Sequence, residues 1–480
     1  MKHKPDKTNF QVTEHDKIIK KHLQIINSEQ KYKNKYDKLF TKILARTKEL
    51  WLPSSDKSNQ NIIQETINSN SWFDINEYKS IETNSNFEAN FTVQTTDNIV
   101  KCQKIKMHPT KLQKDLLLNW MHSYIKMYNE TLKVIKKNAF SNTPLTFNWK
   151  KLRTNYMKKI KEDILKKSNI TIGHINKTQV NGHILDFAIQ DACSKLKSCI
   201  SNLKNNNIKK FRMRYLKLTK DSMIIKIEKA FISPTKNTFC SSIFKDEFKF
   251  SEDFHLKSID SDFTIHYNRK LDEFYLLNPI KSKSTIGKVG KTSVGIDPGI
   301  RTFLTTFSDN KCTKIGTNLQ KKIIKYLKKI DKLNDPNCTK KEVIRKKLEG
   351  KFYKKIKNIV DDLHWKVINY LTSNYGNILI GNMSTKGIIS NESNSKLSAY
   401  NKRIASFMSL FRFRERLAYK CLSKGIGYSL IDESYTTKTC TKCCYQNDVG
   451  RKEHIKCSFC KLSIERDISG ARNILLVGTN

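Results

Sequence analysis

Four cysteines near the end of the chain form two Cys-x-x-Cys pairs, Cys440/Cys443 and Cys457/Cys460. Thiolates are soft donors, and two such pairs on hairpin tips can surround one tetrahedral metal ion. We predict a structural zinc site, since four protein ligands leave no open position for chemistry. Bound zinc would contribute on the order of 10 kcal/mol to local folding. Reduced cysteines without metal and disulfides are the alternatives, and the spacing of Cys444 and His454 fits a ligand role less well.

Three carboxylates are candidates for the chemistry that a closed zinc site cannot perform. Asp297 lies in TSVGIDPGI, where a short apolar run predicts a buried strand that ends at the aspartate and turns at Pro-Gly. Glu433 follows a strand expected over residues 428–432, and Asp467 opens the last helix. An acidic residue at a strand end, followed by a glycine that lets backbone approach a phosphate, is typical of metal-dependent nucleases. Aspartate and glycine also occur in ordinary turns, so this signal alone is moderate.

Charge is the strongest compositional signal. The 480 residues include 90 Lys+Arg and 45 Asp+Glu, a net charge of +45. Such an excess repels itself unless a polyanion neutralises it, so we expect a nucleic acid partner and salt-sensitive binding. An AT-rich genome would explain the abundant lysine, isoleucine and asparagine, but not the shortage of acidic residues. Most of the 12 cysteines are unpaired by spacing, which indicates an intracellular, reducing compartment, and no apolar run is long enough for a membrane span.

The first part of the chain predicts little packed structure. Residues 1–97 form a polar Lys/Asn-rich N-terminal extension, for which we expect partial order and a helix over residues 37–50. Its lysines either serve as a nuclear import signal or form a solvated face.

Two amphipathic helices and a set of strands are expected next. Thr110 and Gln113 form a plausible capping box before a helix that continues past residue 132, and a second helix covers 185–203. Strand patterns then occupy 211–218, 223–232 and a hairpin that turns at 268–272. We interpret this region as helices beside a small β-barrel.

Arg212 and Arg214 alternate with apolar residues in the first of these strands. This pattern favours contacts to a nucleic acid backbone, but an ordinary half-exposed strand explains it equally well.

The remaining region alternates long helices with short strands. Helices are predicted over 323–333 and 344–371, both rich in lysine, and a buried strand over 378–385. A basic helix over 401–425 ends at glycines.

The motifs GIDPGI, ILIGNMST, ESYTTKTCTKC, CSFC and ERDISGARNIL occur in this order, with a lysine-rich helical insert after the first. Together they resemble the split RuvC nuclease domain and inserted zinc finger of the TnpB family, which are transposon-encoded, RNA-guided DNA endonucleases related to type V CRISPR effectors. The resemblance covers residues 291–478 with specific motifs and 99–290 more weakly. It does not cover residues 1–97.

One departure from the TnpB pattern is informative. TnpB proteins carry a glutamate at the end of the second motif's strand, where this chain has Gly381 followed by Asn382. Eukaryotic and giant-virus relatives called Fanzor lack that glutamate and carry one just before the zinc finger, a place that Glu433 fills here. The chain therefore resembles a Fanzor more than a bacterial TnpB.

Roles for the carboxylates follow from this resemblance and from the chemistry. Hydrolysis of a phosphodiester by two Mg²⁺ ions needs roughly three converging carboxylates. We expect Asp297 to bridge both ions, Asp467 to hold one, and Glu433 to hold the other and help orient the attacking water. If Glu433 proves inert, Glu392, Asp432 and Glu465 are the next candidates for the third ligand.

The resemblance implies an α+β multidomain architecture with a helical recognition region and small β-barrel (wedge), then an RNase H-like (RuvC) α/β domain with an inserted zinc finger. The expected segments are 1–97 (N-terminal extension), 98–288 (wedge with inserted recognition helices), 289–438 (nuclease domain, first part), 439–461 (zinc finger) and 462–480 (nuclease domain, last part).

The implied function is RNA-guided DNA cleavage. A bound structured guide RNA would select double-stranded target DNA, and the expected assembly is a monomeric ribonucleoprotein, in the nucleus of a eukaryotic cell. A heteroduplex held by its backbone needs a long basic channel. Candidates to line it are the lysines of 321–370 and four arginines, Arg403, Arg412, Arg414 and Arg416.

Two other functions fit the same residues. A catalytically inactive RNA- or DNA-binding regulator would explain the missing glutamate at position 381. An unguided transposase or junction-resolving nuclease would use the same fold without bound RNA.

Overall fold

The computed structural model describes residues 50–53, 62–69, 73–80, 99–138, 148–167, 170–172, 175–178, 180–282, 292–389, 397–450 and 452–479. The chain divides into two compact units. Unit 1 comprises Met1–Asp97, Lys283–Lys340 and Phe352–Asn480, and unit 2 comprises Asn98–Ser282 and Lys341–Lys351. These units are coarser than the five expected segments, whose boundaries stay a prediction. None of the described helices has the length and apolar character that crossing a membrane requires.

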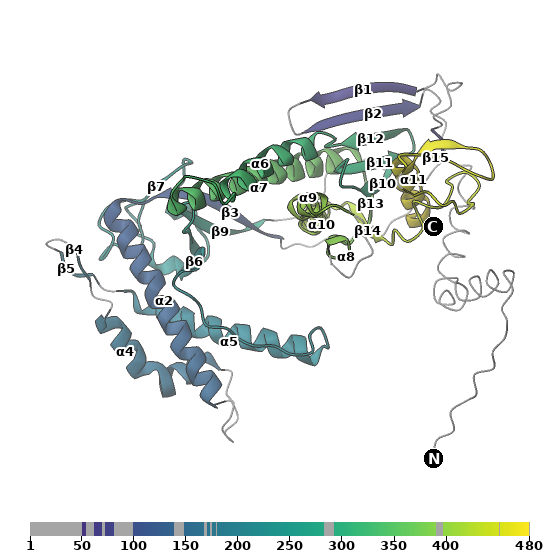
Figure 1. Ribbon diagram of the computed structural model, residues 1–480. Helices are drawn as coiled ribbons and strands as arrows, with labels where there is room; N and C mark the ends of the chain where they lie inside the picture. Colours follow the sequence, from purple (N-terminus) through teal and green to yellow (C-terminus); the bar gives the residue numbers. More distant parts are fainter. Residues whose placement is uncertain are drawn as a thin grey trace, which may run out of the picture. The chain divides into compact units, whose positions relative to one another are not determined.

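Unit 1 is built on a seven-stranded sheet of order β1-β2-β12-β11-β10-β13-β14 (Figure 1). Pairing is antiparallel from β1 to β10, whereas β13 runs parallel to β10, and β14 runs parallel to β13. The carboxyl ends of β10, β13 and β14 therefore meet at one edge. The strands are β1 (Ile62–Ser69), β2 (Asp74–Ser80), β10 (Ser293–Pro298), β11 (Leu304–Ser308), β12 (Lys311–Ile315), β13 (Asn377–Gly381) and β14 (Gly427–Ile431).

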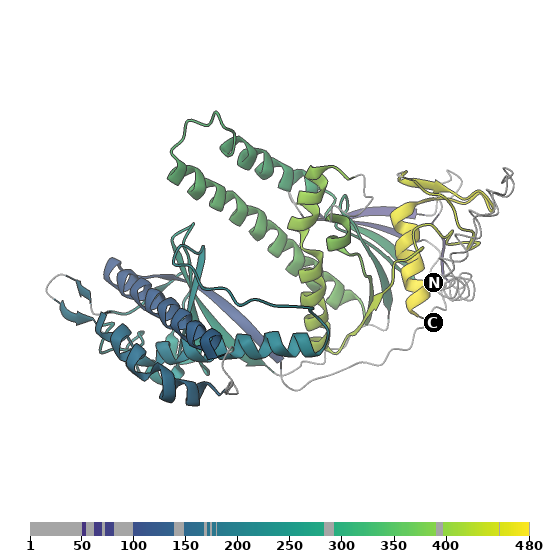
Figure 2. The same ribbon diagram turned by 60° about the horizontal axis from the view of Figure 1, so that its bottom comes forward.

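Helices cover both faces of this sheet, as Figure 2 shows with α11 in yellow on one side and the green helices on the other. The alternation of a strand explains the two layers: Ile378 and Ile380 pack with one set of helices, and Leu379 packs with α11. The first layer holds α6 (Leu319–Leu333), α9 (Ala399–Met408), α10 (Leu410–Lys424) and the part of α7 (Glu342–Asn374) from Phe352 onward, which belongs to unit 1; α11 spans Arg466–Gly478, and a short α8 spans Thr385–Ile389.

The basic helix expected over 401–425 is two helices instead of one. Ser409, with φ of 51°, separates α9 from α10 in a left-handed conformation that ends the first helix. The hydrophobic period continues across this break, so the sequence pattern did not reveal it.

Part of the N-terminal extension is integral to unit 1. β2 pairs with β12, and the Asp74 carboxylate accepts hydrogen bonds from the backbone N–H groups of Thr317 (3.2 Å) and Asn318 (3.3 Å) at the start of α6. The polar composition of β2 did not predict a strand, because its buried acidic residues, Asp74 and Glu77, are stabilised by Thr317 and Lys311, which are distant in the sequence. The helix expected over 37–50 lies outside the described residues apart from its last residue.

Unit 2 contains a five-stranded antiparallel sheet of order β6-β8-β9-β3-β7. The expected hairpin is confirmed, with Asp272 at positive φ in its turn. No pairing among the described strands joins β6 to β7, so closure into a barrel stays a prediction. The strands are β3 (Ile99–His108), β6 (Ser222–Ile227), β7 (Lys249–Phe250), β8 (Phe263–Asn268) and β9 (Glu273–Ser282).

The helices of unit 2 form where capping and periodicity predict them. Thr110 and Gln113 make the reciprocal bonds of a capping box, from Thr110 N–H to Gln113 Oε1 (2.9 Å) and from Gln113 N–H to Thr110 Oγ1 (3.3 Å). The helical elements are α2 (Lys111–Asn138), α3 (Trp149–Leu152), a π-helical turn (Arg153–Met157), α4 (Lys158–Lys167) and α5 (Gly182–Lys204), and a small hairpin joins β4 (Ile170–Ile172) to β5 (Ile175–Thr178).

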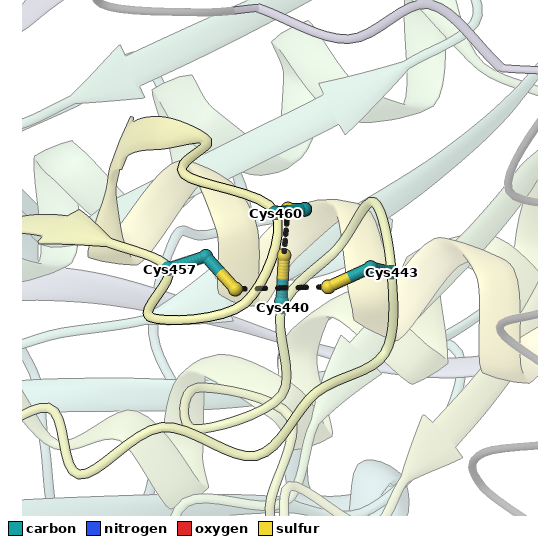
Figure 3. A group of neighbouring side chains, drawn as sticks. All are labelled: Cys440, Cys443, Cys457 and Cys460. Carbon is teal, nitrogen blue, oxygen red and sulfur yellow. Dashed lines mark hydrogen bonds between the residues drawn. The ribbon is translucent and has the colours of Figure 1, made fainter.

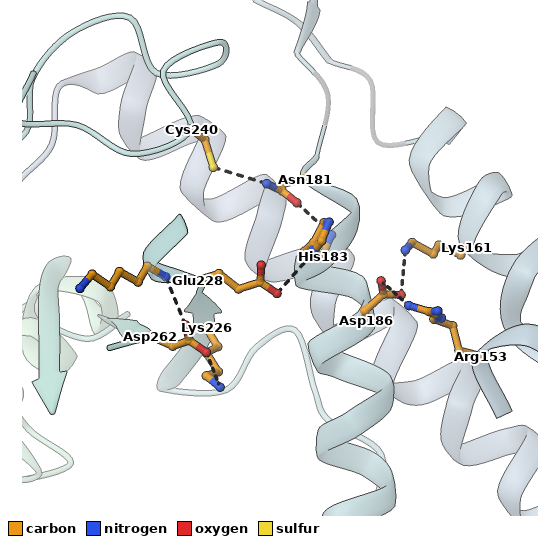
Figure 4. Close-up of polar contacts among 10 residues, drawn as sticks. Arg153, Lys161, Asn181, His183, Asp186, Lys226, Glu228, Cys240 and Asp262 are labelled. Carbon is orange, nitrogen blue, oxygen red and sulfur yellow. Dashed lines mark hydrogen bonds and ion pairs between the residues drawn. The ribbon is translucent and has the colours of Figure 1, made fainter. Parts of the chain in front are cut away.

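Polar contacts anchor the start of α5 (Figure 4). The Asn181 side chain accepts a hydrogen bond from the His183 N–H (2.9 Å) and donates one to Cys240 Sγ (3.4 Å). One turn further, Asp186 accepts a hydrogen bond from Lys161 of α4 (2.7 Å). These contacts link the first turns of α5 to α4 and to Cys240, beside the apolar face of α5 that packs into the core of unit 2.

The strand expected over 211–218 does not form. This segment has no regular secondary structure and pairs with no described strand, and the Asn129 side chain holds it through two hydrogen bonds to the backbone of Leu216 (2.9 and 2.8 Å). Without a partner strand its residues do not sort onto two faces, so Tyr215 remains 46% exposed beside exposed Arg212 and Arg214.

Candidate active site and metal centre

The three predicted carboxylates line one cavity of about 900 Å³ in unit 1. Asp297 lies at the carboxyl end of β10, Glu433 follows β14, and Asp467 lies in the first turn of α11. Parallel strands bring their carboxyl ends to the same edge, and α11 crosses the sheet beside β10. The topology thus brings together side chains that lie up to 170 positions apart in the sequence.

α11 approaches Asp297 at Gly470. A Cβ at this position would lie 2.6 Å from Asp297 Oδ2, so a side chain at residue 470 would displace the Asp297 carboxylate or the helix. Asp467 is one helical turn before Gly470 and therefore lies on the same helix face, toward Asp297.

Gly381, the position at which TnpB proteins have a glutamate, lies directly against Glu433. A Cβ at Gly381 would lie 2.0 Å from Glu433 Oε1 and 2.7 Å from both Cδ and Cγ. The Glu433 carboxyl group therefore occupies the space into which a side chain at position 381 would extend. The Glu433 carboxyl group, just after the neighbouring strand β14, can keep this position only while residue 381 has no side chain.

The electrostatics of the cavity favour a bound cation. Burial, together with the nearby Asp467 and Glu433, raises the pKa of Asp297 well above its ordinary range, and Arg466 opposes this shift. Burial also raises the pKa of Glu433 to about 7, although the Met383 N–H and Arg414 oppose it. Glu433 Oε1 is buried without a hydrogen-bond partner in the described structure. A divalent cation would supply the missing partner and reverse both pKa shifts.

The carboxylate set fits Mg²⁺ in chemistry, because hard oxygen ligands suit this ion. The oxygens are less tightly gathered than the cysteine sulfurs: of the described residues, only the four cysteines form a group of potential ligands with atoms within 4.8 Å of one another. A wider spread is compatible with two ions about 3.5–4 Å apart, each held by different carboxylates.

Sequence reasoning missed Arg466. Its Nε (3.1 Å) and Nη2 (3.0 Å) both donate to Asp467 Oδ1, and its side chain lines the cavity. Its place directly before Asp467 is the signal that could have identified it.

The three fallback ligands fit less well. Asp432 is exposed and accepts hydrogen bonds from Ser434, and Glu465 pairs with Lys314. Glu392 lies outside the described residues.

The four predicted zinc ligands converge on one point (Figure 3). The Sγ atoms of Cys440 and Cys460 are 3.6 Å apart, as are those of Cys443 and Cys457. Sulfurs placed 2.3 Å from a tetrahedral zinc ion would be about 3.8 Å apart, so the geometry fits zinc. The competing candidates Cys444 and His454 are not part of this group.

Two further residues support the cysteine cluster and were not singled out from the sequence. Asn447 Nδ2 donates to Cys457 Sγ (3.6 Å). Arg472 of α11, only 1% exposed, donates to the backbone carbonyls of Thr441, Leu50 (2.6 Å) and Trp51 (3.0 Å). The sequence signal that could have identified Arg472 is a charged residue among the apolar positions of the last helix. Arg472 joins the first cysteine pair, α11 and the N-terminal segment.

The predicted nucleic-acid-binding arginines divide into two groups. Those of α9 and α10 have partners in the fold: Arg403 pairs with Asp331 (2.9 Å), Arg412 and Arg416 pair with Asp361 (3.0 and 2.8 Å), and Arg414 donates to backbone carbonyls. In contrast, Arg212 and Arg214 are exposed and form no ion pair among the described residues. A role in nucleic acid binding stays a prediction for all six.

Comparisons with known proteins address the family. A family model described as Cas12f1-like, TNB domain, matches residues 411–474. The TnpB-like protein L79 of Acanthamoeba polyphaga mimivirus is 32% identical over 401 residues, which cover 79% of this chain and 73% of that protein. The TnpB-like protein L770 of the same virus is 31% identical over 402 residues, with the same coverage of both chains.

Solved structures are more distant. The structure of the mini-RNA-guided endonuclease CRISPR-Cas_phi3 covers 80% of this chain and 93% of its own, with 9% identity and a TM-score of 0.40. The Cas12f1-sgRNA-target DNA complex covers 78% and 99%, with 17% identity and a TM-score of 0.30. TM-scores below 0.5 support no statement about the fold. The sequence relatives are sufficient, however, and their identity and coverage show that the chain belongs to the family of TnpB-like proteins.

Proposed function

We propose that this protein is an RNA-guided DNA endonuclease of the Fanzor type, which hydrolyses phosphodiester bonds at the cavity lined by Asp297, Glu433 and Asp467. The observation that carries the proposal is the contact between Gly381 and Glu433. Gly381 stands where TnpB proteins have a glutamate, and it lies against the Glu433 carboxyl group. This contact is expected if the catalytic ligand has moved from the end of β13 to the end of β14.

The proposed fold of unit 1 is RNase H-like. The order β12-β11-β10-β13-β14, with two antiparallel strands on one side of β10 and two parallel strands on the other, supports this assignment. In such a sheet the central strand carries the aspartate around which the other ligands gather, which is the place of Asp297 on β10.

In the proposed reaction, Asp297 would be a ligand shared by two Mg²⁺ ions, while Asp467 and Glu433 would each hold one of them. Mg²⁺ would polarise the scissile phosphate and lower the pKa of the attacking water. Arg466 lines the same cavity, where its guanidinium group can bind a phosphate oxygen once a metal ion neutralises Asp467. Buried, unpaired Glu433 Oε1 can orient the water.

The guide and the target are the remaining parts of the proposal. Family membership and the net charge of +45 support a bound guide RNA and a DNA target, because a heteroduplex is held mainly through its backbone. The proposed wedge barrel is the sheet of unit 2. Zinc at the four cysteines would hold the segment between Glu433 and Asp467 in place.

Two measurements test this function. RNA that copurifies at low salt is sequenced, and a single structured species with a variable end is the expected result. The complex is then incubated with matching plasmid DNA and Mg²⁺, and Asp297→Asn should abolish cleavage, whereas Asp335→Asn, at an exposed turn, should not.

The same experiments discriminate the alternatives. Cleavage without any bound RNA would indicate an unguided transposase or resolvase. RNA and DNA binding without cleavage, at any Mg²⁺ concentration, would indicate an inactive regulator. Either outcome would refute the proposal.

A further inference from the structure

We infer that Arg414 is a positioning residue for Glu433, which acts by fixing the carboxyl end of β13 rather than by binding nucleic acid. The inference rests on the proposed function, in which Glu433 is a metal ligand. It assigns to Arg414 a role that sequence reasoning, which placed it in a basic channel, did not foresee.

The first observation is the set of groups that Arg414 contacts. The neighbouring Phe413 and Leu417 are fully buried, which fixes α10 against the sheet. From this helix, Nη1 of Arg414 donates to the carbonyl of Met383 (3.0 Å) and, at 3.5 Å, approaches that of Gly381. The guanidinium group thus spans the segment through which the chain leaves β13.

The second observation is that Glu433 depends on the same segment. Gly381 provides the space that the Glu433 carboxylate fills, and the backbone N–H of Met383 lowers the pKa of this carboxyl group. Between them, the Asn382 N–H donates to the carbonyl of Ile431 on β14 (2.8 Å). Residues 381–383 therefore form one wall of the Glu433 site.

These two sets of contacts lie on the same three residues. Arg414 Nη1 lies at the carbonyls of Gly381 and Met383, the Asn382 N–H donates to β14, and Glu433 fills the space beside Gly381. Glu433 Oε1 has no hydrogen-bond partner among the described residues, and it packs directly against Gly381. A shift of these residues would move the carboxylate with them.

The other arginines of α10 differ in this respect. Arg412 and Arg416 both pair with Asp361 of α7, and no hydrogen bond from them to residues 381–383 is described. Arg414 is thus the arginine of this basic helix that contacts the wall of the site.

The loss of a residue that orients a metal ligand typically weakens metal affinity or activity by about 10–100-fold. We expect a weakening in this range for Arg414→Gln. Arg414→Lys should be intermediate, because the ammonium group keeps a charged N–H donor but is more strongly hydrated and sits on a more flexible stem than the guanidinium group.

The test uses the full chain with zinc bound. Mn²⁺ is titrated by electron paramagnetic resonance without nucleic acid, and the sites that disappear in Asp297→Asn define the nuclease site. Lys420→Gln is the matched control, since it removes a charge from α10 at a residue with no described hydrogen bond to residues 381–383. Melting temperatures verify that each variant is folded, and Arg414→Lys replaces Arg414→Gln if the latter does not fold.

A second readout separates positioning from phosphate binding. Affinity for a single-stranded oligonucleotide is measured over a range of salt concentrations. A positioning residue leaves the salt dependence unchanged, whereas the loss of one phosphate contact lowers the log-log slope by about 0.7.

We expect weaker Mn²⁺ binding in Arg414→Gln, wild-type Mn²⁺ binding in Lys420→Gln and equal salt slopes in both. Wild-type Mn²⁺ binding in Arg414→Gln, or a reduced slope without weaker Mn²⁺ binding, would overturn the inference. The failure of this inference is distinguishable from the failure of the proposed function. If the protein never cuts DNA but Arg414→Gln weakens Mn²⁺ binding, the proposed function is refuted and the inference about Arg414 is supported.

Discussion

The substitution Gly381→Ala should inactivate the nuclease while leaving the protein folded. All three atoms nearest to the added Cβ belong to Glu433, at 2.0, 2.7 and 2.7 Å. Ordinary contact begins near 3.4 Å, so the carboxylate must move by about 1.4 Å. Since the obstacle is the end of a flexible side chain and not backbone, Glu433 can rotate away.

The expected loss of activity follows from this displacement. A misplacement of about 1 Å in a catalytic group can cost about 100-fold in rate, which corresponds to about 2.7 kcal/mol of transition-state stabilisation. The free energy of unfolding should fall by much less, about 1 kcal/mol, the typical cost of a strained side-chain rotamer.

The assay is single-turnover cleavage of target DNA by the RNA-loaded protein at saturating Mg²⁺, with melting curves in parallel. Gly387→Ala in α8 is the matched control, because the same methyl group would meet only Ser384, with Oγ at 3.5 Å. It should cleave at the wild-type rate.

A rescue experiment tests the steric explanation directly. Glu433→Ala alone should be inactive, and Gly381→Glu in that background should regain part of the activity, because the space is then free for the new carboxylate. Full activity in Gly381→Ala would refute the reasoning, since it would mean that Glu433 can move by more than 1 Å without effect on catalysis.

Three further predictions concern zinc, pH and salt. Replacing Cys457 and Cys460 with serine should release zinc, measured by atomic absorption, and abolish cleavage; an unchanged zinc content would exclude the assigned site. Burial raises the pKa of Glu433 from about 4.5 to about 7. The contribution of this residue to the free energy of unfolding of the metal-free protein should therefore be complete below pH 4.5 and should fall by about 1–3 kcal/mol as the pH rises through 7. Glu433→Gln should reduce this fall in pH-dependent unfolding curves. The double substitution of Arg212 and Arg214 with glutamine should lower the salt slope of nucleic acid binding by about 1.5, and an unchanged slope would show that they do not contact phosphates.

Local signals in the sequence were sufficient for much of the fold. The capping box at Thr110, the hairpin turn at Asp272 and the paired cysteines all depend on residues a few positions apart, so their spacing alone predicts their geometry. The strand that ends at Asp297 was equally clear, because a buried parallel strand is a continuous apolar run.

Predictions failed where structure depends on a distant partner. Residues 211–218 have the alternation of a strand but find no strand to pair with, and β2 has a polar sequence but is ordered by bonds from Asp74 to the start of α6. In both cases the tertiary environment overrides local propensity.

By itself, the sequence determined which residues are candidates for chemistry, namely the four paired cysteines and the three carboxylates, together with an excess of positive charge that favours a polyanionic partner. Only the tertiary structure decided how they act together. The contact between Gly381 and Glu433 joins the ends of two strands separated by α8, α9 and α10, and the partners of Arg414 are the last residue of β13 and Met383 just after it, so neither has a local pattern. The physical reason is that a site depends on distances in space, which the parallel pairing of β10, β13 and β14 sets and which sequence separation does not record.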